Sequence, residues 1–204
     1  MSKLIQRANF IYQFLKNPKE IGAITPSSKH LTRNILSFLD FNKEKLFLIE
    51  YGPGTGPFTS EIVKRLKPTH QLIVIELNSE FATKLKEKFK DHKNVKIYQD
   101  CVTNVKKIIN KIGIKKVDYI ISGIPFSSLP KNRILDILTN TKSIMSQNSI
   151  FLTFQYSKYR KRILEKYFNI IDIKFIARNM PSAYIFCMNK KKSRSKENLN
   201  DLTD

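Results

Sequence analysis

An acid and three glycines, each separated by one residue, stand at Glu50, Gly52, Gly54 and Gly56. The apolar run just before them, 46–49, is too short for a helix and predicts a buried strand that leads into a glycine-rich loop. Pro57 suits the first turn of a helix that follows. A strand, a glycine loop and a helix N-terminus together favour a ligand carrying negative charge, because free backbone N–H groups point into the loop.

The glycine spacing indicates which ligand this is. A dinucleotide fingerprint, G-x-G-x-x-G, would need a glycine where this chain has Pro57. The pattern E-x-G-x-G-x-G instead resembles motif I of class I S-adenosylmethionine-dependent methyltransferases. About 20 residues further on, Q-L-I-V-I-E predicts a second strand ending at Glu76, whose carboxylate can accept hydrogen bonds from both ribose hydroxyls. The alternative is a tight turn with a capping glycine.

Two further strand ends extend the predicted cofactor site. The run 95–100, V-K-I-Y-Q-D, predicts a third strand closed by Asp100, which can accept a hydrogen bond from the adenine amino group while Cys101 packs on the ring. A helix cap is the alternative role for Asp100. A fourth strand delivers Ser122 to the same edge, where open α/β sheets bind ligands. The predicted cofactor-binding residues are Glu50, Gly52, Gly54, Gly56, Glu76, Asp100, Cys101 and Ser122.

Charge and composition limit the partners without choosing among them. The chain has 204 residues, 41% of them apolar, which fits one globular domain. Its 37 basic and 17 acidic residues give a formal charge of +20, which implies attraction to nucleic acid or to an anionic membrane surface. Biased codon usage in an AT-rich genome would also explain the excess of lysine.

Neither a membrane span nor a secretory signal is expected. No apolar run approaches the roughly 18 residues of a spanning helix, and the N-terminus has no apolar block followed by a cleavage site. Cys101 and Cys187 are the two cysteines, and their separation favours neither a disulfide framework nor a metal site. We therefore expect a cytoplasmic protein without a metal.

The first residues predict an amphipathic basic helix over 3–16, within an N-terminal segment 1–20. Its apolar residues fall on one side, and Lys3 and Lys16 lie away from them. Such a helix suits an anionic membrane interface. Packing of the same face on its own domain is the alternative.

The rest of the chain predicts one α/β domain over 21–189 and a disordered charged tail over 190–204. Strands alternate with helices, and the last two β-rich runs, 170–178 and 183–189, read as an antiparallel hairpin. The pattern predicts a seven-stranded, mostly parallel sheet with helices on both faces. The resemblance to motif I implies that this sheet is a Rossmann-like class I methyltransferase fold. Helices are expected over 29–38, 58–66, 79–90, 102–112, 130–145 and 158–168.

The end of the fourth strand bears on the methyl acceptor. In methyltransferases acting on the amino group of adenine, this strand typically ends in Asn or Asp followed by P-P-Y/F or L-P-Y/F. Here the run is Ser122-Gly123-Ile124-Pro125-Phe126, which keeps the Pro-aromatic pair and places Gly123 at the Asn/Asp position. An adenine amine gripped by an amide is therefore disfavoured.

Several segments together resemble the bacterial phospholipid N-methyltransferases, a group related to the rRNA adenine dimethyltransferases. The resemblance implies stepwise methylation of phosphatidylethanolamine towards phosphatidylcholine by a protein peripherally associated with the inner face of the cell membrane. The rRNA enzymes usually add a helical C-terminal domain, for which no room is expected here. The segments are 14–28, 50–59, 121–130, 151–157 and 178–186.

A lipid amine must lose a proton before attack, and the methylated products remain cationic. His30 and Tyr156 are the candidate bases, and Phe126, Tyr156 and Tyr184 the candidate aromatic cage. Arg178 is expected to meet the lipid phosphate, with Ser127 as a further substrate contact. Two alternatives stay open: an RNA or DNA adenine N-methyltransferase, and a non-catalytic membrane-associated protein that binds S-adenosylmethionine.

Overall fold

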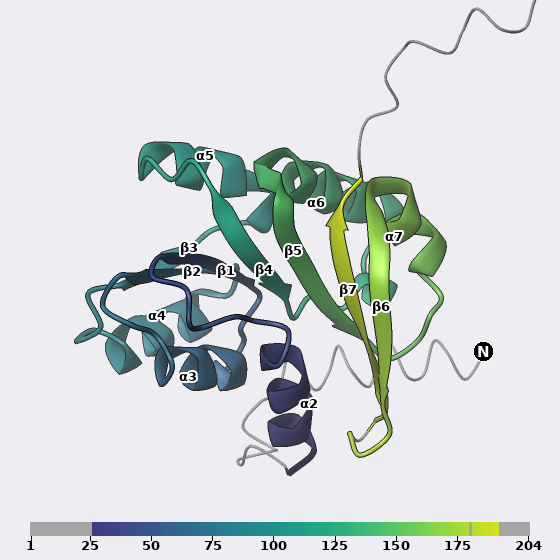
Figure 1. The fold of residues 1–204 in the computed structure, drawn as a ribbon, viewed down its shortest axis with the longest axis horizontal. Helices are drawn as coiled ribbons and strands as arrows, with labels where there is room; N and C mark the ends of the chain where they lie inside the picture. Colours follow the sequence, from purple (N-terminus) through teal and green to yellow (C-terminus); the bar gives the residue numbers. More distant parts are fainter. Residues whose placement is uncertain (1–25, 180, 192–204) are drawn as a thin grey trace, which may run out of the picture.

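The computed structural model describes residues 26–179 and 181–191, which form one seven-stranded sheet in the order β3-β2-β1-β4-β5-β7-β6 (Figure 1). The strands are β1 (Leu46–Tyr51), β2 (His70–Glu76), β3 (Val95–Gln99), β4 (Val117–Ser122), β5 (Met145–Gln155), β6 (Phe168–Ile176) and β7 (Ala183–Lys190). The pairs from β3 to β5 are parallel, whereas β7 runs antiparallel to both β5 and β6. The predicted fold class, including the C-terminal hairpin, is confirmed.

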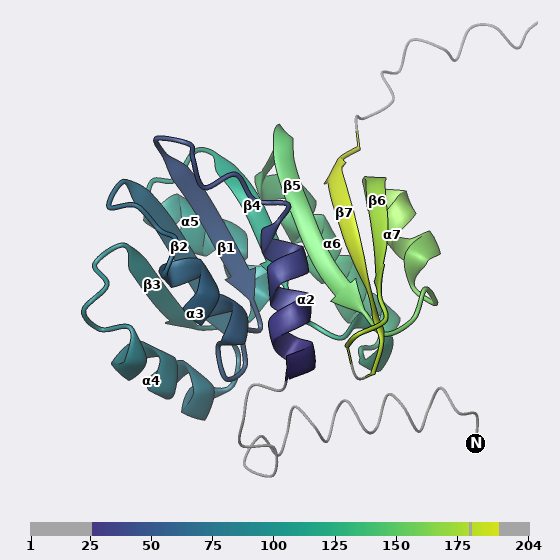
Figure 2. The same ribbon diagram turned by 60° about the horizontal axis from the view of Figure 1, so that its bottom comes forward.

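The connecting helices lie on both faces of the sheet (Figure 2). The α-helices are α2 (Pro26–Leu36), α3 (Pro57–Val63), α4 (Ser79–Lys88), α5 (Val105–Lys111), α6 (Lys131–Ile144) and α7 (Lys161–Tyr167), with 3-10 turns η2 (Val102–Asn104) and η3 (Phe126–Ser128). Local chemistry explains where two of them begin. Pro57 opens α3, and the Asn78 side chain accepts a hydrogen bond from the Phe81 N–H at the start of α4.

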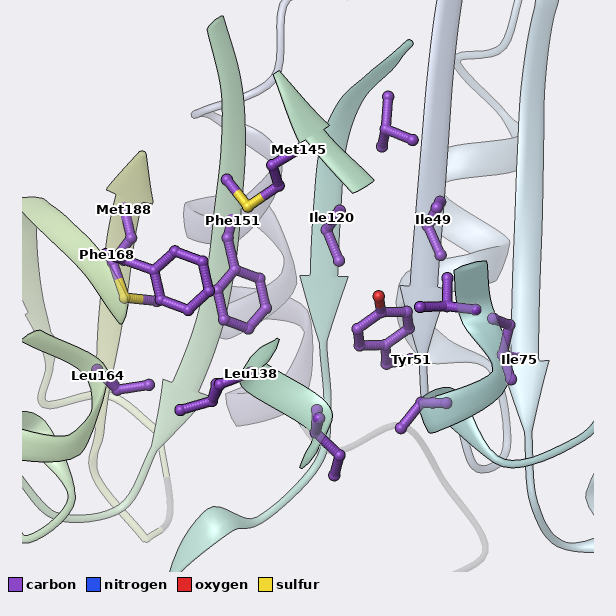
Figure 3. Packing of buried hydrophobic residues seen from close by; sticks show 14 of the residues in the cluster. Ile49, Tyr51, Ile75, Ile120, Leu138, Met145, Phe151, Leu164, Phe168 and Met188 are labelled. Atoms are coloured by element: carbon purple, nitrogen blue, oxygen red, sulfur yellow. The ribbon is translucent and has the colours of Figure 1, made fainter. Parts of the chain in front are cut away.

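Two apolar cores hold these layers together. On one face Leu31 of α2, Ile62 of α3 and Leu85 of α4 pack against the sheet. On the other, α5, α6 and α7 cover a cluster that includes Tyr51, Phe151 and Phe168 (Figure 3). The sheet is thus buried on both sides, which is why its central strands read as continuous apolar runs in the sequence.

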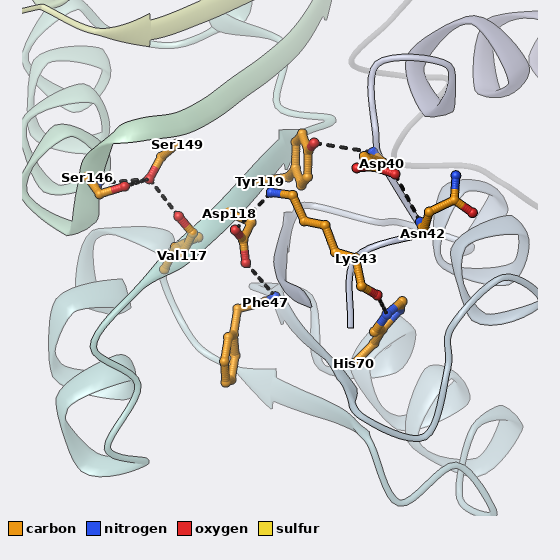
Figure 4. Close-up of polar contacts among 10 residues, drawn as sticks. All are labelled: Asp40, Asn42, Lys43, Phe47, His70, Val117, Asp118, Tyr119, Ser146 and Ser149. Carbon is orange, nitrogen blue, oxygen red and sulfur yellow. Dashed lines mark hydrogen bonds and ion pairs between the residues drawn. The ribbon is translucent and has the colours of Figure 1, made fainter. Parts of the chain in front are cut away.

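A polar network ties together the amino ends of the central strands (Figure 4). The carboxylate of Asp118, at the start of β4, accepts hydrogen bonds from Lys43 Nζ at 3.1 Å and from the Phe47 N–H at 3.0 Å. Nε2 of His70, at the start of β2, lies 2.9 Å from the Lys43 carbonyl oxygen. These contacts fix the edge of the sheet opposite to the carboxyl ends of the strands.

The structure refines the predicted boundaries. The predicted helix 102–112 is a 3-10 turn followed by α5, and the predicted helix 158–168 begins at Lys161, which leaves 156–160 as a loop at the carboxyl edge. Strand β5 begins at Met145 and contains the irregular pairing that separates the Met145–Val117 pair from the Ile150–Tyr119 pair. The predicted helix 3–16 and nearly all of the predicted tail 190–204 lie outside the described residues.

Candidate cofactor and acceptor site

The glycine-rich loop joins the carboxyl end of β1 to the N-terminus of α3. Gly54 and Gly56 adopt φ angles of +58° and +78°, in the left-handed region that favours glycine. A Cβ on Gly56 would lie 2.5 Å from Leu85 Cδ2, whereas a Cβ on Gly54 would meet nothing within 4 Å. The loop therefore packs closely on α4 at Gly56 and has free space beside Gly54.

Glu76 connects this loop to the end of β2. One carboxylate oxygen accepts a hydrogen bond from the Gly54 N–H at 3.0 Å, and the other accepts one from the Asn78 N–H at 2.8 Å. Glu76 is buried, but each oxygen of a carboxylate has a second lone pair. The predicted contacts with two ribose hydroxyls are compatible with these bonds and remain a prediction.

Glu50 is the most deeply buried acid of the site. One oxygen accepts a hydrogen bond from the Thr59 hydroxyl at 2.7 Å, and the other, Oε1, is buried with no hydrogen-bond partner in the described part of the chain. Burial raises the pKa of Glu50 to about 7, against the lowering effect of the Thr59 bonds. A buried acceptor without a partner fits a ligand that brings a cationic donor, such as the amino group of S-adenosylmethionine.

Asp100 and Cys101 follow β3 at the same edge. Oδ1 of Asp100 accepts hydrogen bonds from the Cys101 N–H and from Asn104 Nδ2, each at 2.7 Å. The residues that cap η2 and α5 are Cys101 and Asn104, without side-chain capping bonds, so Asp100 does not have the helix-capping role that the sequence left open. Among the described residues no hydrogen bond reaches Oδ2, which leaves that oxygen able to meet an adenine amino group.

The end of β4 packs tightly against the end of β1. A Cβ on Gly123 would lie 2.7 Å from the carbonyl oxygen of Gly52, and the Gly123 N–H donates to the Tyr51 carbonyl at 2.9 Å. Ser122 is fully buried, and its Oγ accepts a hydrogen bond from the Ile124 N–H at 3.2 Å. Ser122 therefore supports the loop from inside, and direct contact with the cofactor, as the sequence suggested, does not match this position.

Gln155, which sequence reasoning missed, holds the loop after β4. Its Nε2 donates to the Ile124 carbonyl at 3.0 Å and to the Thr153 hydroxyl at 2.9 Å, while its Oε1 accepts from the Phe126 N–H at 3.1 Å. The side chain is buried at the last position of β5. A polar residue closing an apolar strand run was the available signal.

The three aromatic residues of the expected cage are not brought together. Phe126 has no exposed surface and packs in the core beneath α5 and α6, so it lacks the open ring face that the cage hypothesis requires. Tyr184 lies half-buried at the margin of that core, whereas Tyr156 packs against the core on the opposite face of the sheet. The Tyr184 ring is itself in contact with Lys158, whose Nζ lies 4.8 Å from its centre, and with the Phe175 ring, whose centroid lies 4.9 Å away.

The two candidate bases differ in their settings. Burial raises the pKa of Tyr156, which keeps its hydroxyl protonated and disfavours it as a proton acceptor. His30 lies half-buried on α2. The predicted substrate contacts lie on different elements: Arg178 is exposed in the turn between β6 and β7, and Ser127 is half-buried in η3.

Neither a metal cluster nor a membrane span is found in the described part of the chain. Within 26–179 and 181–191 no three His, Cys, Asp or Glu side chains lie where they could share a metal ion. The helices in these ranges are all too short or too polar to cross a bilayer.

Comparison with known proteins relates the chain to two kinds of methyltransferase. The model of the family described as ribosomal RNA adenine dimethylase matches residues 4–167. An ornithine lipid N-methyltransferase of Singulisphaera acidiphila is 28% identical over 190 residues, which cover 90% of this chain and 96% of that protein. The ribosomal RNA small subunit methyltransferase A of Mycoplasma mycoides is 37% identical over 134 residues, 61% of this chain and 47% of that protein. The chain thus spans less than half the length of this rRNA-modifying relative.

Solved structures agree on the fold. The N-methyltransferase NodS of Bradyrhizobium japonicum, in complex with S-adenosyl-L-homocysteine, superposes with a TM-score of 0.68 at 11% identity and covers 89% of this chain and 98% of NodS. A SAM-dependent methyltransferase of Aquifex aeolicus gives a TM-score of 0.65 at 14% identity, with 87% and 98% covered. At these identities the likeness is one of fold.

Proposed function

The chain belongs to the ribosomal RNA adenine dimethylase family and is an S-adenosylmethionine-dependent methyltransferase, and from this premise we propose that its methyl acceptor is the amine of a lipid head group. The specific acceptor proposed is phosphatidylethanolamine, methylated stepwise towards phosphatidylcholine. Bound S-adenosylmethionine supplies an electrophilic methyl group on a sulfonium. The protein has to hold the amine in line with that methyl group and accept its proton.

Gly123 is the observation that carries the proposal. Adenine methyltransferases use an Asn or Asp at this position to grip the planar amine. Here the carbonyl oxygen of Gly52 would stand 2.7 Å from any Cβ at Gly123, so such a side chain would require one of the two backbones to shift. A lipid amine needs no planar recognition, and backbone carbonyls are sufficient acceptors for its N–H groups.

We propose the Ile124 carbonyl as the acceptor for that amine. Gln155 donates to it at 3.0 Å and so fixes its direction, and the carbonyl oxygen has a second lone pair for a substrate N–H. We propose that this lone pair orients the amine towards the methyl group. The buried Gln155 acts here as a positioning residue that does not itself touch the substrate.

The comparisons support the lipid class by coverage as well. The ornithine lipid enzyme matches 90% of this chain, whereas the rRNA enzyme of Mycoplasma mycoides matches 61% of it. Similarity that extends over more of the chain favours the lipid substrate class.

The surface at the carboxyl edge of the sheet supports association with a membrane. Tyr159, 64% exposed, lies beside the exposed Lys158 in the loop after β5, and Phe175, 53% exposed, lies beside the exposed Lys174 at the end of β6. Figure 1 shows the loop after β5 and the turn between β6 and β7 at the same end of the molecule. Exposed aromatic rings among basic side chains suit an anionic bilayer surface. We propose peripheral association with the inner face of the cell membrane, assisted by residues 3–16.

The test is transfer of labelled methyl from S-adenosylmethionine to vesicles containing phosphatidylethanolamine or an ornithine lipid, with total RNA offered in parallel. Label is expected in the lipid phase, and chromatography of the head groups then identifies the lipid and counts the methyl groups. Label in RNA alone would contradict the proposal. Label in neither, with cofactor binding intact, would support the non-catalytic binding protein instead.

Adenine N-methylation of RNA is the second candidate. Family membership, the charge of +20 and the Pro125-Phe126 pair favour it. The geometry at Gly123 opposes it, and the RNA arm of the same experiment decides between the two.

A further inference from the structure

Two buried donors without hydrogen-bond partners lie on the loops that follow β4 and β5. Nε of Arg160 and Oγ of Ser128 are both buried, and no described residue bonds to either. Nη2 of Arg160 donates to the Leu129 carbonyl at 3.4 Å, so the guanidinium stands beside the residue next to Ser128. Buried polar groups are normally bonded, and two unpartnered donors on loops joined by the Arg160–Leu129 bond indicate a ligand that accepts hydrogen bonds.

The surroundings of Arg160 favour an anion as that ligand. No acidic residue occurs in 156–163 or in 173–184. The Arg160 guanidinium carbon lies 4.9 Å from the centre of the Tyr159 ring, and Lys158 Nζ lies 4.8 Å from the centre of the Tyr184 ring. Among the described residues no carboxylate forms an ion pair with Arg160. A charged guanidinium in this position is therefore available to an oxyanion.

Ser128 and the loop 156–160 both adjoin residues that hold the proposed amine position. The Ser128 N–H donates to the Pro125 carbonyl at 3.0 Å, and Pro125 directly follows Ile124, whose carbonyl is the proposed amine acceptor. In phosphatidylethanolamine two carbons and one oxygen separate the amine nitrogen from phosphorus. An amine at Ile124 thus leaves its oxyanion within reach of η3 and of the loop 156–160.

We infer that Arg160 and Ser128 bind the oxyanion of the lipid head group while its amine lies at the Ile124 carbonyl. This inference rests on the proposed function and assigns to Arg160 the contact that the sequence favoured for Arg178. The bond to Leu129 is at the outer limit of hydrogen-bond length, so the guanidinium can release it at small cost and present Nε and Nη2 together. The oxyanion is a phosphodiester in phosphatidylethanolamine and a carboxylate in an ornithine lipid.

The test compares Arg160→Gln, Arg160→Lys and Ser128→Ala with two variants that remove one charge elsewhere, Arg162→Gln and Arg178→Gln. Arg162 is an exposed residue of α7, two positions from Arg160. KM and kcat are measured with phosphatidylethanolamine and with ornithine lipid in detergent micelles, and affinity for S-adenosylmethionine is measured by calorimetry.

Arg160→Gln is expected to raise the lipid KM about tenfold or more, since a charge-assisted bond is lost, with little change in kcat or in cofactor affinity. Arg160→Lys restores only part of the loss because it lacks the planar fork. A rise with one lipid alone identifies the phosphodiester or the carboxylate as the ligand.

An unchanged KM in Arg160→Gln, or an equal rise in Arg162→Gln, would overturn the assignment of Arg160, and a rise confined to Arg178→Gln would return the contact to Arg178. Wild-type protein that methylates neither lipid would instead overturn the proposed function, and the assignment with it. The two failures are distinguishable because the first appears only in the variants.

Discussion

The carboxylate of Glu76 accepts a hydrogen bond from the backbone N–H of Gly54, a residue 22 positions earlier in the chain, at 3.0 Å. This bond joins the end of β2 to the glycine-rich loop after β1. The acid and the loop that the sequence assigned separately to one cofactor therefore form a single unit, and a change in one reaches the other.

Glu76→Ala should weaken binding of S-adenosylmethionine. The variant removes the expected acceptor of the ribose hydroxyls and also leaves the Gly54 and Asn78 N–H groups without their partner. Hydrogen bonds to charged groups contribute about 1.5–3 kcal/mol, so the Kd should rise about tenfold or more. Calorimetric titration measures this. Glu87→Ala, which removes an exposed acid of α4, is the matched control, and an unchanged Kd for Glu76→Ala would exclude it from the site.

Glu50→Gln should remove a pH dependence from the stability of the fold. Burial raises the pKa of Glu50 to about 7, whereas the ordinary pKa of a glutamate side chain is 4.5. Between these values the folded protein keeps a proton that the unfolded chain has released, so the free energy of unfolding falls as the pH rises. Above pH 7 Glu50 is ionised in both the folded and the unfolded state, so the destabilisation caused by burying its charge no longer changes with pH.

The difference in the free energy of unfolding between Glu50→Gln and wild type should be near zero at pH 4.5. Above pH 7 it should reach about 3 kcal/mol in favour of the variant. Urea unfolding at a series of pH values measures it, and other titrating groups cancel in the difference. Curves that stay parallel from pH 4.5 to pH 8 would show that Glu50 titrates normally in the folded protein.

The sequence was sufficient for the fold because each strand has a clear apolar run and its own turn chemistry. Candidate residues for the cofactor could be proposed from the sequence for the same reason, since Glu76 and Asp100 close predicted strands and the glycines mark a loop. The role of Gln155 could not be predicted, because it depends on β5 lying beside β4, and Ile124 is 31 residues away in the chain. Phe126 looked like a ligand contact because a Pro-aromatic pair does not reveal which way its ring turns.

Deleting residues 1–16 should weaken binding to anionic vesicles. The predicted helix carries Lys3, Arg7 and Lys16, and each basic residue near an anionic surface contributes about 1 kcal/mol, so the loss should be roughly 100-fold. Sedimentation with anionic vesicles measures it, with phosphatidylcholine vesicles as the uncharged control. Equal binding by the truncated chain would refute the role of this segment and leave the exposed edge around Tyr159 as the membrane contact.

Tyr156→Phe should leave the methyl-transfer rate within about twofold of wild type. Burial raises the pKa of the Tyr156 hydroxyl, so almost none of it is ionised at neutral pH. A general base contributes typically 10²–10⁴-fold, and a loss of about that size would identify Tyr156 as the proton acceptor after all. Tyr156→Ala separates the effect of the hydroxyl from that of the ring. It also removes the ring, which packs edge-on against Phe154 with the two ring centroids 5.9 Å apart.

Gly123→Ala should impair methyl transfer through a steric effect on the loop after β1. The φ angle of Gly123 is accessible to alanine, but the new Cβ would stand 2.7 Å from the Gly52 carbonyl, so one of the two backbones must shift. Overpacking of this kind costs about 1–3 kcal/mol of stability. Because a displacement of about 1 Å in a reacting group can cost 10²-fold, we expect kcat/KM to fall at least tenfold.

Gly113→Ala is the control that separates loss of stability from loss of geometry. Gly113 has a φ angle of +73°, a Cβ at this position would meet nothing within 4 Å, and the residue lies between α5 and β4, at the amino end of that strand. Its alanine variant should lose about 1–2 kcal/mol through backbone strain and keep its kcat/KM. If both variants lose stability but only Gly123→Ala loses activity, the close contact between the ends of β1 and β4 is needed for transfer. Full activity in Gly123→Ala would mean that a side chain is tolerated there, and the case against an adenine acceptor would lose its main support.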